Sequence, residues 1–278
     1  MDWVTTPFEL GFQQRALVGG AIAAVALALV GVWMVIRGMS FLGDALVHGV
    51  VPGIALAILF DFHVLLGAIG AALVMMLGIN LVHRQTTFSE DTSIGLLFVG
   101  MLGVGVILIS RTDSYAGNLT EILFGDSLGV TDNDVWLLTG LLVVTLVATL
   151  LLYRPFLVLS FNEQKARLLG LRPRLAHMAM LGLITLAIVA SFQTVGTLLV
   201  FGLLVGPPAT ATLMVNRVPA IMTTAAIIGV LSVVAGLMIS YHADTSGSAS
   251  MAVTPIALFF IVLSVKSLRS RASAERAR

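Results

Sequence analysis

Cysteine is absent from this sequence of 278 residues, which excludes disulfide bonds, thiolate metal sites and a cysteine nucleophile. Charged residues are also scarce, at 10%, whereas hydrophobic residues make up 58% of the chain. A soluble domain has about 25% charged and about 45–50% apolar residues. The composition is therefore that of a membrane protein with several spans, and we expect lipid bilayer rather than nucleic acid around it.

Motifs of common enzymes are missing as well. The sequence contains no Gly-x-Ser-x-Gly, no His-Glu-x-x-His and no Gly-x-x-x-x-Gly-Lys-Ser/Thr phosphate loop. Its two lysines, Lys165 and Lys266, follow glutamine and valine rather than glycine. We therefore do not expect an enzyme, and we expect no permanently bound cofactor. If transport is driven by ATP, the ATP must bind to another polypeptide.

Long apolar runs predict an all-α fold, a polytopic transmembrane helical bundle of about nine spans, with eight or ten as the alternatives. We expect residues 1–278 to form one transmembrane domain. It would begin with an interfacial segment at 1–15 and end with a basic cytoplasmic tail at 266–278. The expected spans cover residues 16–36, 41–60, 63–82, 94–110, 135–153, 175–193, 195–216, 219–240 and 251–268.

Two of these spans contain helix-breaking residues. The second contains Pro52 and Gly53, and the seventh contains Gly206, Pro207 and Pro208. Because proline removes a backbone donor, we expect broken helices near Pro52 and Pro207. Interrupted spans are where transporters commonly expose backbone groups to a substrate, so these residues are candidates for helix breaks and gating.

The distribution of Lys and Arg predicts the orientation of the chain. With the N-terminus outside, every basic residue except Arg15 and Arg111 falls on the inner side. The positive-inside rule then places the C-terminus in the cytoplasm. Most acidic residues fall on the outer side, which favours cations arriving from there. Asp44 is the acidic residue that remains within a span.

Asp44 and His48 are an unusual pair because they lie four residues apart inside apolar sequence. On a helix this spacing places both on one face, with Cβ atoms about 5–6 Å apart. Carboxylate and neutral imidazole are suitable ligands for zinc, manganese or ferrous iron. Two ligands do not complete a site, so the rest must come from other groups in the chain or from the same pair in a second copy.

A structural interpretation of this pair remains open at this point. Asp44 could pair with Arg37 or cap the start of its helix, with His48 as a packed hydrogen-bonding residue. Arg37 follows the first span, however, and is better placed to reach lipid headgroups than a buried acid. The remaining histidines fall at predicted membrane edges, where we expect interfacial side chains rather than ligands: His63, His83, His177 and His242.

The longest inner connection contains a predicted short helix at 162–170. Asn162 is a suitable N-cap, Glu163 suits the positive end of the helix dipole, and Gly170 suits the C-terminal end. Pro173 prevents the helix from continuing. One interpretation is a basic surface helix that anchors the loop on anionic lipid. The other is a rigid contact for a separate ATPase.

Three stretches together resemble the permease subunits of the zinc/manganese/iron ABC importer family, the metal-ion branch of the B12- and siderophore-type importers. They are Met39–Gly53, with Asp44-Ala-Leu-Val-His48 at its centre, Phe161–Leu171 and Val195–Ala209. The first motif is highly specific and the other two are supportive. One departure is the sequence Gly-Pro-Pro at 206–208, where members of the family commonly have Ala-Pro-Ala.

The resemblance implies a helical permease of a prokaryotic inner membrane that pairs with a second permease copy. It also implies a cytoplasmic ABC ATPase as a partner, and an extracytoplasmic metal-binding protein that delivers the ion. By this resemblance Asp44 and His48 contact the metal in the translocation path. The 162–170 helix corresponds to the coupling helix that docks on the ATPase, with these candidate residues: Asn162, Glu163, Ala166, Leu169 and Gly170.

The expected cargo is zinc or manganese, with ferrous iron also permitted, and we give zinc a slight preference. Two alternatives compete with an ABC importer of metal ions. One is a stand-alone cation channel or secondary transporter that uses the same pair. The other is a siderophore or cobalamin ABC permease, whose bulky cargo gives no reason for a carboxylate and an imidazole in mid-path.

Overall fold

The computed structural model describes residues 11–87, 89–110, 130–161 and 172–276, and this part of the chain contains helices and no strands. Nine segments within these ranges are long and apolar enough to span a membrane, one of which is Ser40–Leu59. The predicted helical bundle of about nine spans is therefore confirmed. In chain order the helices are α2 (Gly11–Ile36), α3 (Ser40–Gly49), α4 (Val51–Leu59), α5 (Val64–Gln85), α6 (Glu90–Ile109), α8 (Asp132–Leu151), α9 (Tyr153–Phe161), α11 (Pro173–Val195), α12 (Thr197–Met214), α13 (Val218–Ala243) and α14 (Gly247–Arg276).

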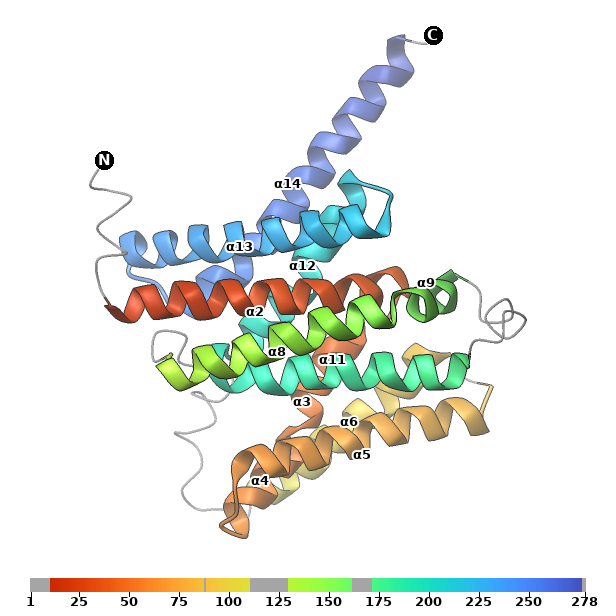
Figure 1. Ribbon diagram of the computed structural model, residues 1–278, viewed down its shortest axis with the longest axis vertical. Coiled ribbons are helices and arrows are strands. Elements are labelled where there is room, and N and C mark those ends of the chain that lie inside the picture. Colours follow the sequence, from red (N-terminus) through yellow and green to blue (C-terminus); the bar gives the residue numbers. More distant parts are fainter. Residues whose placement is uncertain (1–10, 88, 111–129, 162–171, 277–278) are drawn as a thin grey trace.

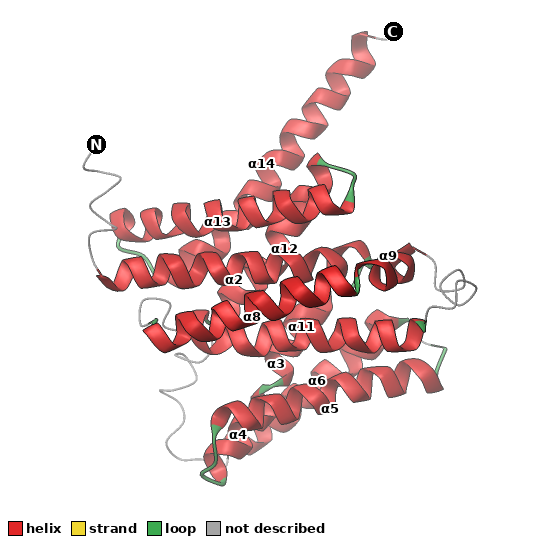
Figure 2. Cartoon of the chain, in the orientation of Figure 1, coloured by secondary structure: helices red, strands yellow, loops and turns green. Residues whose placement is uncertain are grey.

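The spans fall into two groups that are joined in the middle of the molecule (Figure 1). Helices α3, α4, α5 and α6 pack on one another at the bottom of the view, and α2, α12, α13 and α14 form the upper group. Helix α11 contacts α3 and α5 as well as α2 and α12, so it connects the groups. Figure 2 shows that the described connections between spans are short.

The first two spans are joined by a glycine turn. Gly38 has a φ of 71°, in the left-handed region that favours glycine. Its N–H donates to the carbonyl of Val35, and the N–H of Met39 donates to the carbonyl of Met34, both at 3.0 Å. This pair of bonds is the Schellman motif, which satisfies the last carbonyls of α2. The second span can therefore begin at Ser40, directly beside the end of the first.

The predicted interruption near Pro52 is present. Helix α3 ends at Gly49 and α4 begins at Val51, with Pro52 in its first turn. Pro52 has no N–H, so the carbonyl of His48 cannot receive the usual bond from the residue four positions later. The second span is thus a helix pair that bends immediately after His48.

The predicted break near Pro207 is wrong. Helix α12 runs from Thr197 to Met214 with Pro207 and Pro208 inside it. The proline at 208 leaves the carbonyl of Leu204 without its helical donor, and that carbonyl packs directly against Gly31 of α2. Close packing on a neighbouring helix therefore stabilises a proline-containing helix that would otherwise break.

The break in this part of the chain occurs earlier, at Gly196. This residue has a φ of 82° and separates α11 from α12 without any intervening loop. Such a φ is readily adopted by glycine and is costly for residues with a Cβ atom. The expected spans 175–193 and 195–216 already separate within two residues of Gly196, whereas the additional break predicted at the prolines is absent.

Several helices cross at glycines with their backbones in contact. Gly53 of α4 and Gly67 of α5 meet reciprocally, because a Cβ atom added to either would collide with the carbonyl group of the other. A Cβ atom on Gly236 of α13 would likewise collide with the backbone of Met251 in α14. Small residues allow this approach, which supplies the van der Waals contact that holds helices together in lipid.

Helix α9 is an element that the sequence did not lead us to expect. It follows α8 directly and packs on the C-terminal end of α2 through aromatic side chains. The ring of Trp33 lies 5.7 Å from that of Tyr153 and 5.6 Å from that of Phe156, both in edge-to-face arrangements. Trp33 and Phe156 are completely buried. The chain that leads into residues 162–171 is therefore packed against the first span.

Substituting Gly67 with valine should destabilise the protein by at least about 2 kcal/mol, because the new side chain must displace the backbone of α4. Gly70→Val is the matched control on the same helix, since no atom lies within 4 Å of a Cβ atom built there. Thermal unfolding of the two purified variants in detergent measures the difference. Equal melting temperatures would show that the crossing contributes nothing to stability.

Candidate metal site in the second span

Asp44 and His48 lie on one face of α3 and contact each other. Nε2 of His48 is 3.5 Å from Oδ1 of Asp44, and the two side chains are 30% and 33% exposed. The predicted i,i+4 pairing is thus present, with both groups half-buried at the surface of a single chain. A cation that approached this face would meet an oxygen and a nitrogen ligand together.

The structural alternatives for Asp44 do not fit this arrangement. Among the described residues its ion-pair partner is His48 rather than Arg37. The N-cap of α3 is Met39, and no side chain provides a capping hydrogen bond there. Asp44 therefore has no visible structural task in the helix, apart from the contact with His48.

At the Asp44 and His48 pair, the described part of the chain offers two ligands for a metal ion. No group of three or more His, Asp or Glu side chains with metal-binding geometry occurs among the described residues. The pair by itself is an incomplete coordination shell, because zinc takes four ligands and manganese takes more. Further ligands must come from water, from undescribed residues or from another chain.

The bend after His48 is packed firmly rather than left open. Gly49 lies against the sulfur of Met75 in α5, and Met75 is completely buried. Pro52 lies against Gly105 of α6, where an added Cβ atom would be 3.3 Å from the proline nitrogen. The predicted gating residues Pro52 and Gly53 are both buried in these contacts. They set the direction in which α4 leaves the site.

The residues predicted for a second break do not join the pair. Gly206 packs against Pro255 of α14, and Pro208 lies close to Gly31 of α2. Helix α12 contacts α3 next to the pair through other residues: Leu204 and Phe201 pack on Gly43, the residue before Asp44. The gating role predicted for Gly206, Pro207 and Pro208 stays a prediction.

The predicted coupling helix lies outside the described residues, and this applies to all five of its candidates: Asn162, Glu163, Ala166, Leu169 and Gly170. The helices on either side of it are described. Helix α9 precedes it and packs on α2, and α11 follows it and contacts α3. Both helices that flank the predicted coupling segment therefore pack on spans that contact α3, or belong to such a span.

Phe98 of α6 is a neighbour of the pair that sequence reasoning missed. Its ring centroid lies 6.0 Å from that of His48 and 5.4 Å from that of Phe41. Phe41 could have been connected with the site from its position, because it shares a helix face with Asp44 and His48. No feature of the sequence identifies Phe98, since its contacts depend on how α6 packs on α3.

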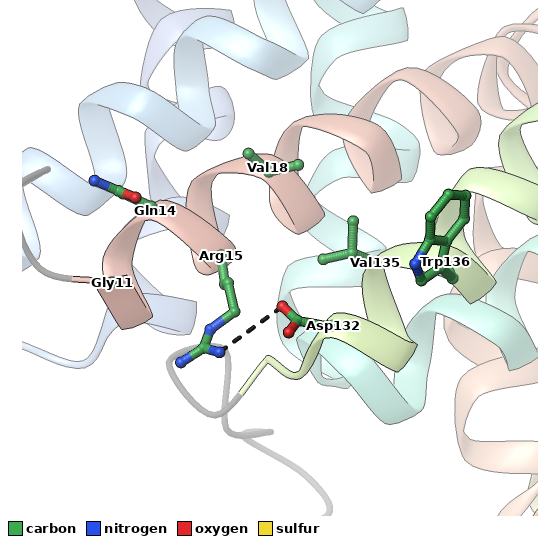
Figure 3. A pocket seen from close by; sticks show the side chains of 7 residues that line it. All are labelled: Gly11, Gln14, Arg15, Val18, Asp132, Val135 and Trp136. Carbon is green, nitrogen blue, oxygen red and sulfur yellow. Dashed lines mark ion pairs between the residues drawn. The ribbon is translucent and has the colours of Figure 1, made fainter.

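A separate cavity lies at the opposite end of α2 from the turn into α3 (Figure 3). It has a volume of about 590 Å³ between the first turns of α2 and α8. Arg15 and Asp132 face each other across it with Nη1 and Oδ1 3.8 Å apart, and Trp136 lies beside them. Exposed ion pairs of this kind contribute little to stability, and none of the predicted metal ligands lines the cavity.

Two of the other histidines are described with their surroundings. His63 is the N-cap residue of α5 and makes no side-chain capping bond. His242 lies near the end of α13, where Nδ1 is 2.9 Å from the carbonyl oxygen of Met238. Neither belongs to a candidate metal cluster among the described residues.

Comparison with known proteins gives concordant matches over nearly the whole chain. The sequence pattern of the ABC 3 transport family matches residues 9–266. The manganese transport system membrane protein MntC of Listeria innocua is 35% identical over 255 residues, which are 91% of this chain and 90% of that protein. The probable iron transport system membrane protein of Haemophilus influenzae is 31% identical over 272 residues, 97% of this chain and 99% of that protein.

A solved structure agrees in fold and in sequence. It is that of PsaBC from Streptococcus pneumoniae in complex with Fab, in which one chain superposes with a TM-score of 0.81. The sequences are 30% identical, and the match covers 94% of each chain. The arrangement of helices described above is therefore shared with a chain of that complex.

Replacing Asp44 and His48 together by alanine should leave the protein folded, because a partly exposed ion pair contributes about 0–1 kcal/mol. Trp33→Ala should cost about 3–5 kcal/mol, since it empties a fully buried aromatic site. Thermal unfolding in detergent compares the two variants. A double alanine variant as unstable as Trp33→Ala would assign the pair a structural role.

Proposed function

Because the chain belongs to the ABC 3 transport family, we propose that it is the membrane-spanning permease of an ATP-driven importer for divalent transition-metal ions. It is a multi-pass membrane protein with nine candidate spans among the described residues. The observation that carries the proposal is the pair formed by Asp44 and His48. A carboxylate at membrane depth is costly and is retained where it binds or conducts an ion.

Manganese is the first expectation for the cargo, with ferrous iron second. The relatives described above are named for manganese and iron transport, and none of these names mentions zinc. One carboxylate and one imidazole per chain suit all three ions, so the ligand set alone does not select among them. The slight preference for zinc drawn from the sequence is therefore given up in favour of manganese.

The coordination shell is completed by a second permease copy. A two-fold axis beside α3 brings together two carboxylates and two imidazoles, which is a sufficient set for a divalent ion. The partial exposure of both side chains supports this arrangement, because a face that is open in one chain is available to another. Four oxygen and nitrogen ligands without a thiolate bind reversibly, as a transport site requires.

ATP is hydrolysed by a separate cytoplasmic ABC ATPase that docks on residues 162–170. Its motion reaches the metal pair through two attachments. Helix α9 is fixed to α2 by the aromatic cluster around Trp33, and α11 contacts α3 directly. A displacement of the docked segment therefore shifts α11 against α3 and changes the access to Asp44 and His48.

The ion enters from the outer side and leaves into the cytoplasm. An extracytoplasmic metal-binding protein delivers it to an outward-facing cleft between the two permease copies. All basic residues of the chain except Arg15 and Arg111 lie inside, so the C-terminal end of α14 is cytoplasmic. Near that end Lys266 donates a hydrogen bond of 2.7 Å to the carbonyl of Leu213, which holds α14 on the last turn of α12.

Replacing Asp44 and His48 together by alanine should reduce uptake of manganese by at least about tenfold, because even the loss of groups that only orient ligands costs about 10–100-fold. Uptake of radioactive manganese into liposomes that contain the permease and its ATPase measures this effect. The matched control is the double alanine variant at His242 and Asp244, an imidazole and a carboxylate outside the candidate site. Normal uptake by the Asp44 and His48 variant would refute the site.

A bulky residue at Ala166 should separate ATP hydrolysis from transport. Ala166→Trp would displace the docked segment from the ATPase, so hydrolysis should continue with little dependence on metal while uptake falls. The control is Asn216→Trp in the exposed connection between α12 and α13. Coupled transport at the normal ratio of ions to ATP in the Ala166 variant would count against the docking assignment.

A further inference from the structure

The metal pair lies beside an aromatic contact that spans two helices. Phe41, Asp44 and His48 occupy positions i, i+3 and i+7 of α3, so they form one stripe along the helix. Phe98 of α6 touches both aromatic members of this stripe, with ring centroids 5.4 Å from Phe41 and 6.0 Å from His48. The ring plane of Phe98 crosses that of Phe41 at 77° and that of His48 at 64°, which is the edge-to-face geometry that aromatic rings prefer.

The position of Phe98 is fixed by glycines on both sides of α6. Its neighbour Leu97 fits over Gly78 of α5, where an added Cβ atom would come 2.5 Å from the leucine methyl group. About two turns after Phe98 on the same helix, Gly105 fits against Pro52 of α4. These two contacts set the rotation of α6 about its own axis. Phe98 is therefore directed at α3 by the packing of the whole group.

We propose that Phe98 is a positioning residue for metal coordination, and this inference rests on the proposed function of the pair. Its ring restricts the imidazole of His48 to the orientation in which Nε2 faces Asp44. A histidine with a free side chain would lose rotamer freedom on binding a metal, and this loss would weaken the affinity. Because Phe98 restricts the ring beforehand, the metal meets a nitrogen and an oxygen that are already in place.

The same contact also affects the surroundings of the pair. Together Phe41 and Phe98 place apolar surface beside the two ligands, which limits the access of water from that direction. Electrostatic attraction between a cation and its ligands is stronger where water is excluded. The open side of the pair is then the side away from Phe98, and this is the side that a second permease copy must approach.

Substitutions of Phe98 distinguish a purely structural role from a positioning role, because the two roles predict different metal affinities for the variants. If the ring only filled space between α3 and α6, leucine would replace it adequately, and metal affinity would follow protein stability. If the ring orients His48, a residue with an aromatic ring is required. Phe98→Tyr keeps the ring, whereas Phe98→Leu keeps apolar volume without it.

The experiment measures the dissociation constant for manganese and the KM for uptake with the purified permease and ATPase complex in lipid nanodiscs and liposomes. An edge-to-face aromatic contact is worth about 0.5–1.5 kcal/mol, so Phe98→Leu should raise both constants about 2- to 10-fold. Basal ATP hydrolysis and the melting temperature should stay near those of the unmodified complex. Phe98→Tyr should restore the affinity.

Phe260→Leu is the matched control. The ring of Phe260 on α14 has a similar contact with Phe259, at 5.4 Å and 76°, but it is 59% exposed and distant in sequence from the site. This variant should bind manganese with unchanged affinity. Equal affinity of the Phe98→Leu and Phe260→Leu complexes would overturn the inference.

The double alanine variant at Asp44 and His48 separates failure of this inference from failure of the proposed function. If that variant loses manganese binding while Phe98→Leu keeps normal affinity, the metal site stands and the positioning role is wrong. If the double alanine variant binds and transports manganese normally, the site itself is wrong, whatever Phe98 does.

Discussion

Backbone contact at glycines is the constraint on which the rest of this structure depends. In lipid there is no hydrophobic gain from bringing one apolar helix against another, so helices associate where their backbones can approach closely. Gly53 and Gly67 provide such a crossing between α4 and α5, and Gly31 provides one between α2 and α12. These crossings determine the distances between spans. The position of every side chain between the spans follows from them.

The metal pair shows how local and distant contacts combine. Asp44 and His48 share a face of α3 because of their spacing, and this would be true in any helical environment. Their partial exposure, the ring of Phe98 beside them and the bend that follows them come from α5 and α6. The short helix therefore carries the two proposed ligands, whereas the neighbouring spans supply the ring and the packing beside them. Such a division suits a half-site that a second chain completes.

The two proline positions illustrate what a sequence can and cannot say about helix breaks. Pro52 interrupts the second span as expected, and the bend is filled by Met75 and Gly105 of neighbouring helices. Pro207 and Pro208 do not interrupt α12, because the carbonyl of Leu204 packs on Gly31. Proline always removes a donor, but whether the helix breaks depends on what lies against the freed carbonyl.

The sequence by itself determined the class of this protein, the approximate number of spans and the spacing of Asp44 and His48, because hydropathy and helical spacing are local properties that need no knowledge of neighbours. The boundaries of the single domain and the task of residues 162–170 stay predictions. Only the tertiary structure decided that α12 continues through Pro207 and Pro208, that α9 packs on Trp33 and that Phe98 reaches His48. These features depend on contacts between residues far apart in the chain, and no local pattern encodes which faces of two helices will meet.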